Sequence, residues 1–287
     1  MHPHSWAVGR IGPLVTAPDF FTSSESTGRL GELDVDGALE RWREDGYARL
    51  GRLLDDGRLS ALRARADAIM RGELVVPGLF FQHDAASGRY EDLEHGRGWQ
   101  GPSLSYRKIE KLEADPLFRE VVDEPRCAPL VRAIYGGAAA ISVYRAILMS
   151  KPAGGGTPLP WHQDGGRFWG LDREPVCQIW TALDDAPEDG GCVEVLPGSH
   201  RTGLATPLGG VVPAALVAAA HADARAVKLP ARAGEAILLH NHVWHRSARS
   251  GTGLLRRAFS VCYLDGDTKC LRKKGPPRRF FRAFAGG

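Results

Sequence analysis

The chain has 287 residues, of which 43% are hydrophobic and 25% are charged, and its formal net charge at pH 7 is +3. This length and composition predict one large domain with a substantial core. Residues 268–287 hold seven Lys and Arg and no acidic residue, so the rest of the chain carries a net charge of −4. A weakly acidic body argues against nucleic-acid binding, and we expect no nucleic-acid partner.

The five cysteines are widely spaced and form no CxxC pair, which argues against a disulfide framework and against a thiolate zinc site. The N-terminus lacks a basic start followed by a continuous apolar run. No stretch approaches the roughly 18 uninterrupted apolar residues of a membrane span. We therefore expect a cytoplasmic protein with reduced thiols that is neither secreted nor inserted in a membrane.

Helices are predicted mainly in the first half of the chain. Residues 1–30 mix Pro, Gly, Ser and Thr, which predicts an extended arm. Residues 31–267 are expected to form a single domain. Residues 268–287 form a basic tail that we expect to be solvated, to pack on the surface or to steer an anionic substrate. Residues 73–107 are rich in Gly, aromatic and charged residues without a clean period, which predicts a lid over a pocket. Apolar spacing predicts helices over 36–45, 56–70 and 116–135, the last broken around Pro125 and Pro129, and a strand over 47–54.

Alternating patterns from Ala138 onward predict a mainly β protein with flanking helices. An Ala-rich piece at 211–224 interrupts them and predicts a loop with a short helix. Several short strands at this spacing are typical of a sandwich or a jelly roll. The predicted strands are 140–150, 177–185, 192–200, 224–231, 235–245 and 256–265.

His162 and Asp164 form an HxD motif in a segment where a strand is expected. Residues two apart on a strand point to the same face, so both side chains are placed to chelate one metal ion. The motif alone is weak evidence, because a surface His and Asp in a loop give the same pattern. A second HxD, His221 and Asp223, lies where helical geometry would point its side chains about 200° apart, and we do not expect it to chelate.

A third metal ligand is expected from another strand, and residues 235–245 offer His240, His242 and His245. Regular alternation would place His240 and His242 on one face and His245 on the other. Spacing alone does not choose among them, and each taken singly is more often a core or rim histidine.

Arg256 lies eleven residues beyond His245, and a hairpin would bring it back beside that histidine, with Ser247 adding a hydroxyl. Arginine suits the distal carboxylate of a 2-oxo diacid, because it is a bidentate and permanently charged donor. Two imidazoles, a carboxylate and a guanidinium are the set that a non-haem Fe(II) oxygenase needs. The alternative is that Arg256 and Arg257 are exposed strand charges.

At these residues the chain resembles the phytanoyl-CoA dioxygenase family of Fe(II)/2-oxoglutarate oxygenases. The shared pattern is HxD, the segment LPGSH at 196–200, a distal His followed by Ser after two residues and Arg after eleven, and then RAFS at 257–260. The resemblance spans about 36–265. Arg246 stands where members commonly have Gly, and residues 73–107 match no known pattern.

The resemblance implies a double-stranded β-helix, a cupin-like jelly roll, flanked by helices. It implies a catalytic Fe(II) on His162, Asp164 and His245, with 2-oxoglutarate held by Arg256 and Ser247 and with O2 as the oxidant. It also places two further residues near the co-substrate, Trp180 and Lys108, for which a core Trp and a surface Lys are the alternatives.

The implied activity is hydroxylation, or a related oxidation such as desaturation or ring closure, of a small-molecule substrate with release of succinate and CO2. The carboxylate of Asp164 disfavours halogenation, because halide-transferring relatives lack it. The Arg, Ala and Gly bias is typical of a high-GC bacterial protein, and by analogy it favours a secondary metabolite over an acyl-CoA as substrate. Candidate pocket walls are Tyr106, Arg107, Trp161, Phe168, Trp169 and Trp244.

Two other classes of protein compete with this interpretation. A zinc-dependent hydrolase would use the same three ligands, but it would leave Arg256 and Ser247 without a role. A non-catalytic jelly-roll binding protein would not need all three metal ligands. Succinate release in the presence of iron, ascorbate and O2 separates the oxygenase from both.

Overall fold

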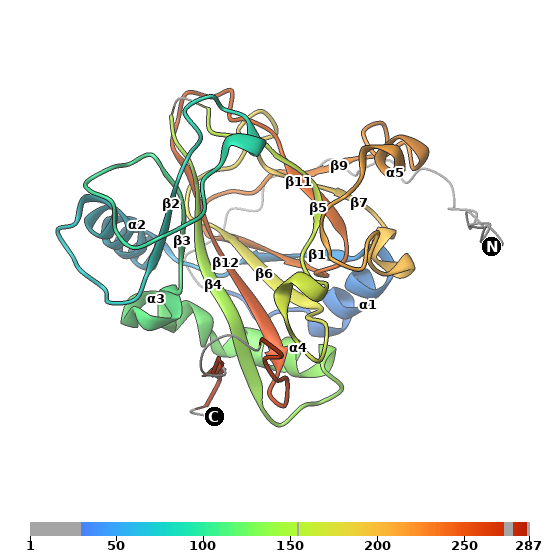
Figure 1. Ribbon diagram of the computed structural model, residues 1–287. Coiled ribbons are helices and arrows are strands. Elements are labelled where there is room, and N and C mark those ends of the chain that lie inside the picture. The colour runs from blue at the N-terminus through green and yellow to red at the C-terminus, as the bar shows by residue number, and fades with distance from the viewer. Residues whose placement is uncertain (1–29, 154, 273–277, 286–287) are drawn as a thin grey trace.

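Two antiparallel sheets face each other in this computed structural model, which describes residues 30–153, 155–272 and 278–285 (Figure 1). The larger sheet has the order β1-β10-β6-β12-β4-β3-β2, with β13 also paired to β4, and the smaller has the order β8-β5-β11-β7-β9. The mainly β class and the jelly-roll core are thereby confirmed. The arm predicted at 1–30 lies almost entirely outside the described residues, and no described helix is long and apolar enough to cross a membrane.

The first four strands lie in the larger sheet, and from β5 to β12 the chain crosses repeatedly between the two sheets. The larger sheet contains β1 (Tyr47–Arg52), β2 (Phe80–His83), β3 (Tyr106–Glu110), β4 (Ile141–Lys151), β6 (Cys177–Ala182), β10 (Glu235–Leu239), β12 (Arg256–Asp265) and β13 (Phe281–Ala283). The smaller sheet contains β5 (Leu159–Gln163), β7 (Val193–Leu196), β8 (Gly210–Val211), β9 (Val227–Leu229) and β11 (Trp244–Ser247). The α-helices are α1 (Val35–Asp45), α2 (Asp56–Arg71), α3 (Pro116–Val122), α4 (Ala128–Ile134) and α5 (Ala214–Ala219), and short 3-10 helices are Tyr90–Asp92, Leu112–Ala114, Pro125–Cys127, Arg167–Trp169 and Ser199–Thr202.

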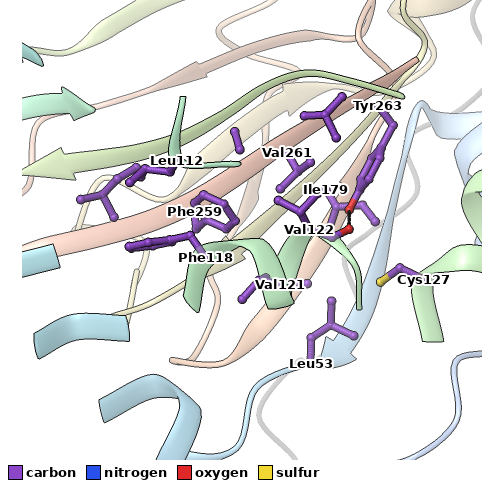
Figure 2. Packing of buried hydrophobic residues seen from close by; sticks show 14 of the residues in the cluster. Leu53, Leu112, Phe118, Val121, Val122, Cys127, Ile179, Phe259, Val261 and Tyr263 are labelled. Carbon is purple, nitrogen blue, oxygen red and sulfur yellow. Dashed lines mark hydrogen bonds between the residues drawn. The ribbon is translucent and has the colours of Figure 1, made fainter. Parts of the chain in front are cut away.

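The helices α1 to α4 cover the outer face of the larger sheet and bury the main core there (Figure 1). Aspartates cap the N-termini of α1, α2 and α3. Their side chains accept hydrogen bonds from backbone N–H groups that have no partner within the helix. Figure 2 shows α3 packed on β12, where the rings of Phe118 and Phe259 lie 5.0 Å apart. The Tyr263 hydroxyl donates to the carbonyl of Val122 at 2.9 Å, so the polar end of this buried ring is satisfied.

The segment 235–245 is not the single strand that alternation predicts. It divides into β10 in the larger sheet and β11 in the smaller sheet, and a turn at 240–243 joins them, with the N–H of Val243 donating to the carbonyl of His240. The predicted hairpin between His245 and Arg256 is also wrong, because β12 pairs with β4 and β6 in the larger sheet. The chain changes sheets between these residues, and period alone carries no signal for such a crossing.

The lid region and the basic tail contribute strands that the sequence does not predict. Residues 73–107 include β2 and the start of β3, which extend the larger sheet beyond β4. In the tail, β13 pairs with β4, and Arg119 donates to the carbonyl of Arg282. The described part of the tail therefore packs on the surface of the domain, which was one of the alternatives for it.

Arg257 faces the helices and is only 6% exposed, so its interpretation as an exposed strand charge is wrong. Its guanidinium contacts Asp184 at 2.8 Å and Asp67 at 2.6 Å. Removing one member of a buried ion pair leaves the other charge without compensation.

We expect the Arg257→Met protein to lose about 2 to 4 kcal/mol of unfolding free energy, because Asp67 loses its partner in a partly buried site. Urea denaturation measures this loss. The matched control is Arg173→Met, which removes a half-exposed ion pair with Asp265 and should cost less than about 1 kcal/mol. Equal losses in the two variants would contradict the structural role of Arg257.

Candidate metal centre

The ligand atoms of His162, Asp164 and His245 all lie within 4.8 Å of one another. His162 is on β5 and His245 on β11, where the two residues are direct register partners, and Asp164 immediately follows β5. The imidazole centroids are 3.9 Å apart. Within the described residues this is the one group of three such side chains that is close enough to hold an ion.

The glycines after Asp164 end β5 and fix the turn that carries the carboxylate. The Asp164 N–H donates to the carbonyl of Asn241 at 2.8 Å, which ties this turn to the crossing between β10 and β11. Gly166 has φ +86°, and a Cβ there would lie 2.4 Å from the carbonyl oxygen of Leu208. Only glycine fits this position without a shift of the neighbouring backbone.

Both histidines present the same ring nitrogen to the site. Nδ1 of His162 lies 2.9 Å from the carbonyl oxygen of Pro160, and Nδ1 of His245 lies 2.9 Å from that of Val243. A carbonyl accepts only, so Nδ1 carries the proton in each ring and Nε2 keeps a free lone pair for a metal. Burial, with the neighbouring His245, lowers the pKa of His162 to about 3, which keeps this ring neutral.

Arg145 on β4 holds the carboxylate ligand Asp164, a contact that was not predicted from the sequence. Its Nη2 donates to Oδ1 of Asp164 at 2.9 Å, and its guanidinium lies 4.3 Å from the ring centroid of Trp169. Burial alone would raise the pKa of Asp164, but Arg145, His245 and His162 lower it to about 2. With Oδ1 engaged, Oδ2 remains for a metal and lies 3.7 Å from Nε2 of His245. The sequence signal for this contact is that an arginine interrupts the mainly apolar strand predicted at 140–150.

Arg256 reaches the space between the sheets from β12. Its Nη2 donates to the carbonyl of Gly191 at 2.7 Å, and its guanidinium carbon lies 6.0 Å from the ring centroid of Trp180. Trp180 is 2% exposed and pairs in register with Ser260. Among the described residues, the buried Nε of Arg256 and the buried hydroxyl of Ser260 have no hydrogen-bond partner. Both residues belong to the same alternate set on β12, so two unsatisfied polar groups lie on one face of this strand.

The two other predicted co-substrate residues lie on different sheets. Ser247 is on β11, two residues after His245, and pairs in register with Val193. Lys108 is on β3, and its Nζ lies 2.8 Å from Oε1 of Glu110. Burial lowers the pKa of Lys108, although Glu110 opposes this shift. The structure therefore gives Lys108 a carboxylate partner of its own.

The remaining candidate ligands have other contacts. His240 stacks on Trp42 at 4.9 Å, and Nε2 of His242 lies 3.6 Å from a carboxylate oxygen of Glu174. The segment of the second HxD is a turn rather than a helix, since α5 ends at Ala219. Asp223 accepts from the indole N–H of Trp161 at 2.9 Å and from Arg246.

The LPGSH segment contacts both β11 and α1. The Ser199 hydroxyl accepts the N–H of Trp244 at 2.8 Å, and Nε2 of His200 lies 3.0 Å from the carbonyl of Arg43 on α1. These contacts fix the start of β11 one residue before His245. The motif thereby links α1 to the strand that carries the distal ligand.

The candidate pocket walls do not gather in one place. Trp161 and Trp244 pack with Ala222 in a cluster on the α5 side of the smaller sheet. Trp169 stacks on Tyr144 at 4.4 Å, next to Arg145. The other three are Tyr106, which is buried against His83, Arg107, which lies 3.9 Å from Asp84, and the exposed Phe168.

The fold and the site together define a double-stranded β-helix protein with a His-Asp-His group that can hold a metal ion. The family model of phytanoyl-CoA dioxygenase (PhyH) matches residues 42–258. The chain therefore belongs to the phytanoyl-CoA dioxygenase family.

The following relative and two solved structures share 30% or less of their sequence with this chain. The chain is 30% identical over 183 residues to the mouse "Phytanoyl-CoA dioxygenase domain-containing protein 1", a match that covers 58% of this chain and 60% of that protein. Among solved structures, the epimerase SnoN in complex with Fe3+, alpha ketoglutarate and nogalamycin RO superposes with a TM-score of 0.62 and 17% identity over 86% of this chain and 94% of SnoN. EctD from S. alaskensis with 2-oxoglutarate and 5-hydroxyectoine gives a TM-score of 0.65 and 19% identity over 84% and 83%. At these identities the two structures support the fold.

We expect the Arg145→Met protein to bind a divalent metal about 10- to 100-fold more weakly, because Asp164 loses the donor that fixes its orientation. Calorimetric titration of the metal-free protein with Mn(II) measures this affinity. Arg246→Met is the matched control, since Arg246 adjoins His245 in sequence but contacts Glu194 and Asp223 instead. Metal affinity unchanged by Arg145→Met would contradict the role given to Arg145.

Proposed function

We propose that this protein is an Fe(II)- and 2-oxoglutarate-dependent dioxygenase that hydroxylates, or otherwise oxidises, a small molecule. The observation that carries the proposal is the convergence of His162, Asp164 and His245 from two register-paired strands and a glycine turn. The oxygenase domain is residues 31–267, and the sequence family supports the same class of reaction.

The three side chains fit iron. Two imidazoles and one carboxylate form the facial triad that leaves coordination positions open on Fe(II). Hydrogen bonds from Nδ1 orient both rings, and Arg145 fixes the carboxylate, so the ligands are held in place before the metal arrives.

The space beside the triad fits a 2-oxo diacid. The buried guanidinium of Arg256 and the unpartnered hydroxyl of Ser260 supply donors on one strand face, and Trp180 supplies an apolar wall. Burial lowers the pKa of Arg256 to about 10, which leaves it charged at neutral pH. Ser247 remains a proposed second donor. Iron and 2-oxoglutarate, when bound, supply the oxidising chemistry, with succinate and CO2 as by-products, and the chain orients them and excludes water.

A polar natural product fits this site better than a long acyl chain. Lys108, Glu110 and Arg145 belong to the same alternate sets of β3 and β4, and they bring charge close to Asp164. The structures of SnoN and EctD support this choice, since SnoN is in complex with nogalamycin RO and EctD with 5-hydroxyectoine. We therefore propose a secondary metabolite rather than an acyl-CoA as the class of substrate.

The wild-type protein should release succinate from 2-oxoglutarate in the presence of Fe(II), ascorbate and O2, slowly even without its primary substrate. Asp164→Ala should abolish this release. Succinate is measured by coupled assay or mass spectrometry. A zinc hydrolase would need neither O2 nor 2-oxoglutarate, and a binding module would produce no succinate, so a negative result with iron-loaded protein would refute the oxygenase.

Replacing Arg256 tests the co-substrate site separately. Arg256→Met should weaken 2-oxoglutarate binding by about 10- to 100-fold, because a charge-assisted contact contributes roughly 1.5 to 3 kcal/mol. Calorimetric titration of the iron-loaded protein without O2 gives the dissociation constant. Arg173→Met, at an exposed ion pair, should leave it unchanged. Equal affinity in wild type and Arg256→Met would remove Arg256 from the site.

A further inference from the structure

Lys151 is a second buried cation beside Arg256. It ends β4, and the two residues are direct register partners across the β4–β12 pair, so their side chains leave the sheet on the same face. Each is only 5% exposed. Lysine is almost never buried to this degree without a partner that compensates its charge.

Neither cation has a carboxylate partner in the part of the chain that the structure describes. The Nζ of Lys151 donates to the carbonyl of Thr157 at 3.0 Å, and Arg256 donates to the carbonyl of Gly191 at 2.7 Å. The carboxylate of Asp84 is engaged with the N–H of Thr157, at 3.0 and 3.1 Å. Both cations therefore donate to neutral backbone carbonyls, and Asp84 acts on Lys151 without forming an ion pair with it.

Glycines at two positions enclose the stem of Lys151. A Cβ on Gly191 would lie 2.8 Å from Cδ of Lys151, and a Cβ on Gly156 would lie 3.1 Å from its Cβ. Gly191 also accepts the hydrogen bond of Arg256, so both cations contact the same glycine. This enclosure fixes the path of the lysine stem and keeps it beside the arginine.

We propose that Lys151 binds the distal carboxylate of the 2-oxo diacid together with Arg256. The inference rests on the proposed function and adds a residue to it. An anion supplies the counter-charge that the two cations lack, and a lysine and an arginine on neighbouring strands can approach one carboxylate from two sides. Lys108, which the resemblance places near the co-substrate, already has Glu110 at 2.8 Å.

The charge state of Lys151 gives the proposal a pH signature. Burial, followed by Arg256 and Arg107, lowers the pKa of Lys151 to about 7, while Asp84 opposes this and Arg249 adds to it. Above pH 7 the free protein holds a neutral amine, so binding of an anion must take up a proton. The affinity should therefore fall as pH rises, by up to about tenfold per pH unit, until the pH reaches the pKa that the Lys151 amine has in the complex.

The experiment is calorimetric titration of iron-loaded protein without O2, with two probes. 2-Oxoglutarate carries the distal carboxylate, whereas pyruvate offers the metal the same 2-oxo acid group without it. Lys151→Met should weaken 2-oxoglutarate binding by about tenfold or more and leave pyruvate binding unchanged. Lys151→Arg should restore the affinity and remove its fall between about pH 7.5 and 8.5, because arginine stays charged.

Lys228→Met, at a half-exposed ion pair with Glu188, is the matched control and should leave 2-oxoglutarate binding unchanged. The proposal is overturned if Lys151→Met binds 2-oxoglutarate like wild type, or if both probes weaken equally, which would indicate a structural role for the lysine. If Lys151→Met fails to fold, proton uptake by the wild type, measured in buffers of different ionisation enthalpy, decides instead: no uptake above pH 7.5 refutes the proposal. Failure of wild type to bind 2-oxoglutarate at all would refute the proposed function itself.

Discussion

The register of β5 against β11 is the constraint on which the metal centre depends. His162 and His245 are direct partners in this pair, so one inter-strand register determines whether two imidazoles meet. A slip by one residue would turn one of the rings to the opposite face of the smaller sheet. Several features outside the centre fix this register. Ser199 binds the start of β11, and the backbone of Asp164 binds Asn241 within the crossing from β10.

The same crossing explains why the third ligand is His245 and not an earlier histidine. His240 and His242 lie in the turn between the sheets, where they contact Trp42 and Glu174. Regular alternation along a single strand would have placed His240 and His242 on one face and His245 on the other face. Because the chain leaves one sheet and enters the other, alternation starts again at Trp244, and His245 faces the interior from the smaller sheet.

The sequence was sufficient to predict the parts of the structure that depend on local pattern. The stripe of α2 and the breaks around Pro125 are examples, and each follows from local spacing or a local breaker. The HxD and the distal histidine could be selected because their joint spacing with Arg256 is specific. The partner of each buried charge could not be predicted. That Arg145 meets Asp164, or that Lys151 lies opposite Arg256, depends on strand order in the folded sheets, which single-sequence spacing does not encode.

The interior charges also connect the lid region to both ends of the site. Asp84, which follows β2 in the lid, accepts the N–H of Thr157, and the carbonyl of Thr157 accepts the amine of Lys151. β5 begins two residues later and carries His162. One short loop thus joins the lid, a buried cation beside Arg256 and the strand of the first metal ligand. A displacement of Asp84 would be transmitted to the loop before β5, because the two are joined by direct hydrogen bonds. Residues 73–107 therefore bear on the position of the strand that carries His162.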